Sequence, residues 1–165
     1  MVKKSTEMIS RVDENKLSDC LEVIRRGFGT VADEFGLTME NCPTNGAFMP
    51  LERLENDLAK GKLMFAICDD EKVAAFVQLA KNGEDAVEME KLAVLPEHRH
   101  NGYGKMLIEF AKQKSRELGA AKVTIGIIEE NVRLKNWYEA NGFIHTGIKI
   151  FPHLPFTVGF MECPL

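Results

Sequence analysis

The stretch that decides the fold is residues 88–104, EMEKLAVLPEHRHNGYG, which run directly into a segment with helical spacing. Residues 87–94 have the apolar and β-branched content of a strand, and Pro96 interrupts it. Apolar side chains then recur along one face over residues 105–118, which predicts an amphipathic helix. The stretch therefore has the form of a strand, a loop and a helix.

The loop carries the glycine motif Arg99-x-x-Gly102-x-Gly104 at the start of that helix. The first backbone N–H groups of a helix lack intrahelical partners, and the helix dipole is positive there. Glycines that expose these amides, with Arg99 beside them, predict a site for a phosphate group. Taken alone, the two glycines equally fit a loop that simply ends in a helix cap.

Two better-known phosphate loops do not fit these residues. A P-loop needs Ser or Thr after Gly-Lys, but Gly104-Lys105 is followed by Met106. A dinucleotide fingerprint needs a third glycine where Leu107 stands, and no unit of parallel strand and helix precedes the motif. A nucleotide-like cofactor held by a different kind of loop and a plain helix cap both stay open at this point.

The downstream sequence identifies that kind of loop. Residues 122–128 read as a strand and residues 131–140 as a helix, closed by Asn141-Gly142-Phe143. Together with the glycine loop, the segment NVRLKNWYEANGF resembles the GNAT (Gcn5-related N-acetyltransferase) superfamily, most strongly across residues 86–145.

The resemblance implies an α/β (α+β) fold with a mixed, mostly antiparallel sheet of about seven strands. In that fold the sheet splays between the fourth and fifth strands and about four helices flank it. We expect one N-acetyltransferase domain over residues 7–165, with no linker, repeat or low-complexity segment.

The other predicted elements follow the order of that fold. A helix over residues 15–28 is expected to end at Gly27 or Gly29, and residues 30–50 read as an irregular connection that helps to shape the substrate pocket. The remaining helix is predicted at 51–60, and the remaining strands at 7–12, 62–68, 72–79, from about 85, 143–150 and 156–161.

The cofactor that the resemblance implies is acetyl-CoA, with CoA as product. The backbone of Leu92, Ala93 and Val94 matches the strand edge that hydrogen-bonds the pantetheine arm. The positions that match the pyrophosphate loop are Arg99, His100, Asn101, Gly102, Tyr103, Gly104 and Lys105. Asn131 and Tyr138 match the helix positions that contact the cofactor, and they lie two turns apart on nearly the same face.

The implied reaction needs a base for the amine, an oxyanion donor and a proton for the leaving thiolate. Glu88 is the candidate base, with Glu90 or water as the reserve, because both glutamates share one face of the strand. A strand N–H near residues 92–94 would stabilise the oxyanion, and Tyr138 would protonate the thiolate. The alternatives are a solvated strand edge for Glu88 and a core stripe of Leu134, Trp137 and Tyr138.

Composition narrows the function classes. The net charge of −4 argues against nucleic acid and favours a cationic amine, from a small molecule or a peptide. No apolar run could span a membrane and no secretory signal is visible, so we expect a cytoplasmic protein. The four cysteines and four histidines show no metal-ligand spacing, so no metal is expected.

Three questions stay open at this point. The chain could be an acetyltransferase, a CoA-binding regulatory module without turnover, or a protein-interaction domain of the same fold. The identity of the acceptor amine carries no readable code, although residues 151–156 are expected to help shape its pocket. The sequence also leaves a homodimer open.

Overall fold

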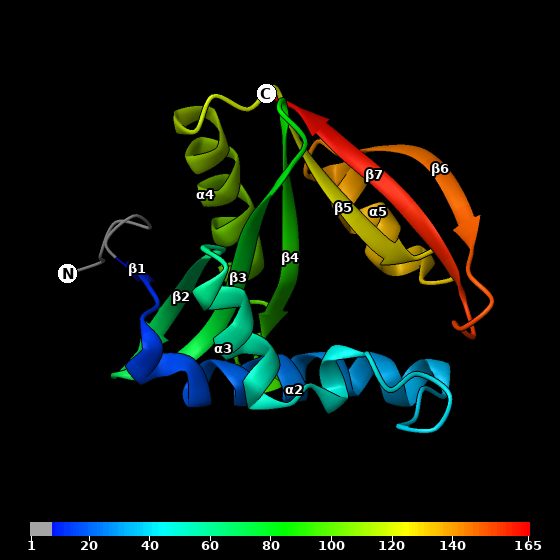
Figure 1. Ribbon diagram of the computed structural model, residues 1–165, viewed down its shortest axis with the longest axis horizontal. Coiled ribbons are helices and arrows are strands. Elements are labelled where there is room, and N and C mark those ends of the chain that lie inside the picture. The colour runs from blue at the N-terminus through cyan, green and yellow to red at the C-terminus, as the bar shows by residue number, and fades with distance from the viewer. Residues whose placement is uncertain (1–7) are drawn as a thin grey trace.

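A computed structural model describes residues 8–165 as a seven-stranded sheet with the strand order β1-β2-β3-β4-β5-β7-β6 (Figure 1). The strands are β1 (Ile9–Arg11), β2 (Leu63–Asp69), β3 (Lys72–Asn82), β4 (Ala86–Val94), β5 (Lys122–Ile128), β6 (Ile144–Ile150) and β7 (Thr157–Pro164). The α-helices are α2 (Leu17–Phe35), α3 (Leu51–Ala59), α4 (Tyr103–Glu117) and α5 (Val132–Ala140). Short 3-10 turns are η1 (Glu14–Lys16), η2 (Gly46–Phe48) and η3 (Pro96–His98). The predicted fold class is confirmed.

Two hydrophobic cores cover the two faces of the sheet. On one face, Val87 and Met89 of β4 pack with Leu107 and Ile108 of α4. On the other face, residues of β2 and β3 pack with α2 and α3, with Phe76 at the centre. Side chains alternate along a strand, so the even-numbered residues Glu88 and Glu90 of β4 point to the face of α2 and α3. None of the helices within residues 8–165 combines the length and apolar character needed to cross a bilayer.

The sheet opens between β4 and β5. This is the one parallel pair in the described sheet, and its register covers only Ala86–Lys122, Val87–Val123 and Glu88–Thr124. Figure 1 shows the two strands side by side near the top and diverging toward α2 below. Beyond Glu88, the edge of β4 that faces β5 therefore has no strand partner within residues 8–165. The predicted splay between the fourth and fifth strands is confirmed.

A bulge in β4 accompanies the opening. Gln78 of β3 pairs with Glu90 and Phe76 pairs with Ala93, so Lys91 and the residue after it stand opposite a single residue of β3. Lys91 has a φ of 55°, which is uncommon for a residue with a side chain. A bulge bends its strand and increases the local twist, which turns the end of β4 away from its neighbour.

The predicted end of the first helix was wrong. The helix α2 continues through Gly27 and Gly29 to Phe35, where Gly36 caps it with a φ of 65°. Gly27 is in the helix because α2 touches β4 there: a Cβ at this position would lie 3.1 Å from the Cβ of Ala93. The other predicted elements match within about three residues, except that residue 7 of the first strand lies outside the described residues.

Residues 30–50 are consequently less irregular than predicted, because 30–35 are helical and η2 covers 46–48. The end of α2 and the following loop form a third apolar cluster with Ile128 of β5 and with Leu154 and Phe156 before β7. The two segments that the sequence assigned to the substrate pocket therefore pack together. They meet at the open end of the gap between β4 and β5.

Candidate active site at the opening of the sheet

The glycine loop forms the start of helix α4. Gly102 is the N-cap of α4 with a φ of 81°, and His100 also has a positive φ of 67°. The first helical hydrogen bond runs from Met106 N–H to the Gly102 carbonyl at 3.0 Å, and no side chain in residues 8–165 caps the helix. The N–H groups of residues 103–105 therefore remain free for a phosphate.

Arg99 is hydrogen-bonded to helix α2. Its guanidinium donates to the Gly27 carbonyl at 3.1 Å and to the Thr30 hydroxyl at 2.8 Å. A second tie between loop and helix is the ion pair of Glu97 with Arg26 of α2, at 2.7 Å. Arg99 thus anchors the loop to α2, and its role toward the cofactor stays a prediction.

Some of the other loop side chains face β2, and the rest are exposed to solvent. The Tyr103 hydroxyl lies 3.4 Å from Asp69 at the end of β2, and His98 approaches the same carboxylate at 3.6 Å. Because the Tyr103 side chain is turned toward Asp69, this residue presents its backbone N–H at the start of α4. His100, Asn101 and Lys105 are exposed, so their side chains are available to a ligand.

The unpaired edge of β4 supplies backbone donors to the gap. Leu95 N–H donates to the Ala74 carbonyl of β3 at 2.9 Å, and Ala93, two residues earlier, has the same parity. Successive N–H groups of a strand point to opposite edges, so the N–H of Val94 points toward β5. The side chains of Leu92 and Val94 pack on the core beside α4, and Ala93 packs on the opposite core.

Helix α5 lines the other wall of the gap through Trp137. A Cβ at Gly104 would lie 3.1 Å from the Trp137 ring, so glycine lets this ring pack closely on the start of α4. Lys112 of α4 donates to the Asn141 carbonyl at the end of α5 at 2.5 Å, which holds the two helices together.

The predicted pair Asn131 and Tyr138 lies at the two ends of α5, both largely buried. The Asn131 side chain is the N-cap of α5 and accepts from Leu134 N–H at 3.2 Å. Tyr138 packs edge-on against Trp137 and Phe143 and is 7% exposed. Burial raises the pKa of its phenol, which keeps the proton on the oxygen. No hydrogen bond within residues 8–165 engages its hydroxyl.

The two candidate bases have different surroundings. Burial raises the pKa of Glu88, and the neighbouring carboxylate of Glu90 raises it further. Burial also opposes ionisation of Glu90, but Lys91, Lys62 and the Gln78 amide outweigh it and lower the pKa of Glu90. Glu90 is therefore held as a paired anion, whereas Glu88 has the character of a proton acceptor.

The network around Glu90 was not predicted from the sequence. Gln78 donates to Glu90 at 2.6 Å and to Asp57 of α3 at 3.2 Å. Lys91 reaches Asp57 at 2.9 Å and Glu90 at 3.3 Å, and Lys62 reaches Glu90 at 3.3 Å. The bulge directs Glu90 and Lys91 into this one cluster. A run of charges inside a strand was the only sequence signal, and it did not identify the partners on α3 and β3.

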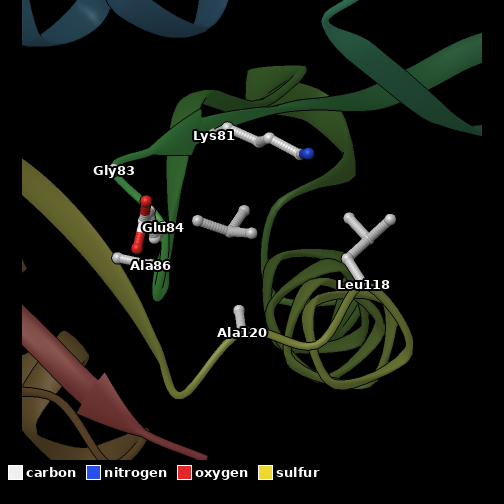
Figure 2. Close-up of a pocket in the computed structure, with 7 residues that line it drawn as sticks. Lys81, Gly83, Glu84, Ala86, Leu118 and Ala120 are labelled. Atoms are coloured by element: carbon white, nitrogen blue, oxygen red, sulfur yellow. The ribbon is translucent and has the colours of Figure 1, made fainter.

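The hollow in Figure 2 lies outside this site. It has a volume of about 290 Å³ at the hairpin between β3 and β4, beside the end of α4. Its lining residues are Lys81, Gly83, Glu84, Ala86, Val87, Leu118 and Ala120. None of the predicted site residues lines it.

Solved structures share the fold of this chain. The PaiA N-acetyltransferase from Thermoplasma acidophilum, in complex with coenzyme A, superposes with a TM-score of 0.79 over 95% of this chain and 98% of its own, at 19% identity. The ribosomal-protein-S18-alanine N-acetyltransferase from Escherichia coli gives 0.74 over 94% and 92%, also at 19% identity. At this identity the likeness shows the fold.

Sequence comparison gives the family. An uncharacterised N-acetyltransferase in the pepI 3′ region of Lactobacillus delbrueckii subsp. lactis is 28% identical over 156 residues, which is 87% of either chain. The sequence model of the acetyltransferase (GNAT) family matches residues 34–143, which is more than half of the 165 residues. The chain therefore belongs to the acetyltransferase (GNAT) family and is a GNAT-type N-acetyltransferase.

Proposed function

We propose that this enzyme moves the acetyl group of acetyl-CoA to a primary amine of a small molecule or a peptide, by direct attack in a ternary complex. The observation that carries the proposal is the opening of the parallel β4–β5 pair directly after Glu88. The same opening is lined by the free strand edge of β4 and by α5. We also propose that residues 7–165 form a single catalytic domain.

The two ends of acetyl-CoA fit two parts of the opening. The free amides of residues 103–105 suit the pyrophosphate, and exposed Lys105 adds a positive charge. The edge of β4 at Leu92 and Val94 suits the amide-bearing pantetheine arm, which would extend the sheet like a short strand. The complex of the Thermoplasma acidophilum structure with coenzyme A supports this cofactor.

The acid and the base would act from opposite sides of the sheet. Tyr138 belongs to the core on the face of α4 and α5, and Glu88 points to the face of α2 and α3. Glu88 would accept the amine proton, directly or through water, as the nitrogen attacks the carbonyl. A free N–H of β4 near residues 92–94 would stabilise the oxyanion, and Tyr138 would protonate the sulfur as the carbon–sulfur bond breaks.

Direct attack is favoured over an acyl-enzyme. Burial raises the pKa of the Cys20 thiol to about 12 and also raises that of Cys42, so neither is a thiolate near neutral pH. Cys163 is buried within β7. The amine class is supported by the Escherichia coli neighbour, which acetylates an alanine of ribosomal protein S18.

The test is an acceptor screen. Purified protein is incubated with acetyl-CoA and a panel of amines and peptides, CoA release is followed, and the products are identified by mass. We expect one class of primary amine to gain about 42 Da, the mass change when an acetyl group replaces a hydrogen, with stoichiometric CoA release. Calorimetric binding of acetyl-CoA without turnover on any acceptor would instead favour the regulatory module. Absence of binding would reject both.

A further inference from the structure

Gly126 lies in the middle of β5 without a structural need for glycine. Its φ is not in the left-handed region, and it is not in a bulge. Among residues 8–165, a Cβ placed there would meet only Val158, at 3.8 Å, which is ordinary contact. A glycine inside a strand weakens it, and it often marks a place where a ligand approaches the backbone.

This glycine faces the same side of the sheet as Glu88. Residues that pair directly point to one face, and Glu88 pairs with Thr124, two residues before Gly126. Gly126 in turn pairs with Phe160 of β7. The row from Glu88 to Phe160 therefore lies on the face opposite α4 and α5, with Gly126 about 6.6 Å along β5 from the partner of Glu88.

Along β5, other contacts cover the residues on either side of Gly126. Toward the open end, Ile128 is covered by the apolar cluster at the end of α2. Toward the end where β4 and β5 are paired, the Lys122 ammonium forms an ion pair with the Glu162 carboxylate at 3.1 Å. Between them Phe160 is 38% exposed, a high value for a phenylalanine, and it flanks the bare backbone of Gly126.

We propose that Gly126 and Phe160 form the subsite for the body of the acceptor, and that the acceptor is a primary amine carrying an apolar chain or ring. The apolar body lies on the Gly126 backbone against the Phe160 ring, and the amino group reaches Glu88. This inference rests on the proposed acetyltransferase activity. A side chain at position 126 fills the subsite, and loss of the Phe160 ring removes its wall.

The test compares two acceptors, 2-phenylethylamine and ethylamine, by the rate of CoA release. The wild-type enzyme is expected to prefer 2-phenylethylamine at least tenfold in kcat/KM. In Gly126→Val this preference is lost, mainly through a higher acceptor KM, while the KM for acetyl-CoA changes less than twofold. Phe160→Ala is expected to lose the same preference.

Stability separates this role from a structural one. Valine suits a strand, so Gly126→Val should unfold at the same temperature as the wild type or higher. The matched control is Gly147→Val on β6, which flanks Phe160 on its far side and also has open space at its Cβ. This control should keep the wild-type preference.

The outcomes are distinct. If the wild-type enzyme releases CoA with amines but shows no preference for the apolar one, or if Gly126→Val keeps the preference, the subsite is overturned and the acetyltransferase activity stands. If the wild-type enzyme uses no amine or peptide at all, the proposed function fails before any variant is made, and the subsite fails with it.

Discussion

Glu88 and Glu90 lie two residues apart on one face of β4, and their surroundings move their pKa values in opposite directions. Burial and the charge of Glu90 raise the pKa of Glu88, while Lys91 and Lys62 overcome burial to lower that of Glu90. The sequence identified both as candidates but could not rank them, because the deciding cations come from β4 and from the loop before β2.

The pH profile tests Glu88 as the base. Because the base acts when deprotonated, wild-type kcat/KM should rise through a pKa above the ordinary glutamate value of about 4.3. Glu88→Gln should remove that step and lower activity about 10²-fold near neutral pH, with a smaller loss as pH approaches the amine pKa of about 10.4. An equal loss at every pH would assign the role to Glu90 or to water.

Glu90→Gln provides the contrast. It removes a partner of two lysines in a largely buried network, so it should lower thermal stability more than Glu88→Gln does. The pH step of the remaining activity should persist in this variant, because Glu88 is still present.

Tyr138 can be tested by removing one oxygen. Tyr138→Phe keeps the packing against Trp137 and Phe143, so the free energy of unfolding should change by less than about 0.5 kcal/mol. The rate should fall about 10²-fold while the KM for acetyl-CoA stays within a few-fold. The chain has only one other tyrosine, and Tyr103→Phe should leave the rate unchanged because its hydroxyl faces Asp69. A fully active Tyr138→Phe enzyme would make Tyr138 a core residue only.

At the scale of elements, α2 is where sequence reasoning failed. Gly27 and Gly29 are weak helix formers, so the pattern favoured an end there. The structure continues the helix because packing overrides propensity: Gly27 lets α2 touch β4, and the helix then reaches Ile128 across the gap. Strands and helices with strong periodicity, such as α4 and β5, were predicted correctly.

The two glycines of α2 should respond in opposite directions to alanine. A methyl group at Gly27 would lie 3.1 Å from the Ala93 Cβ and 3.3 Å from the Val94 carbonyl, both fixed in the sheet. We expect Gly27→Ala to lower the free energy of unfolding by about 1 kcal/mol, the low end for overpacking. A Cβ at Gly29 would have no neighbour within 4 Å in the described part of the chain, so Gly29→Ala should raise the free energy of unfolding by about 0.5–1 kcal/mol. Urea denaturation measures both, and stabilisation by Gly27→Ala would contradict the close contact of α2 with β4.

At the scale of the whole molecule, the sheet consists of two halves joined at both ends of an opening. Three residue pairs of β4 and β5 join them at one end, and the cluster at the end of α2 joins them at the other. The sequence motifs predicted the opening through the family resemblance. They could not show that the connection after α2 and the segment before β7 meet there, because that contact joins residues about 110 positions apart with no shared pattern.

Ligand binding across this opening should be visible in both stability and amide exchange. Coenzyme A at a concentration 100 times its Kd should stabilise the protein by about 2.7 kcal/mol. Hydrogen exchange should slow at the amides of residues 103–105 and at Val94, which have no hydrogen-bond partner among residues 8–165. Pantetheine lacks the pyrophosphate, so it should slow exchange at Val94 while residues 103–105 stay fast. Stabilisation by coenzyme A without slower exchange at residues 103–105 would place the pyrophosphate elsewhere and reject the glycine loop as its site.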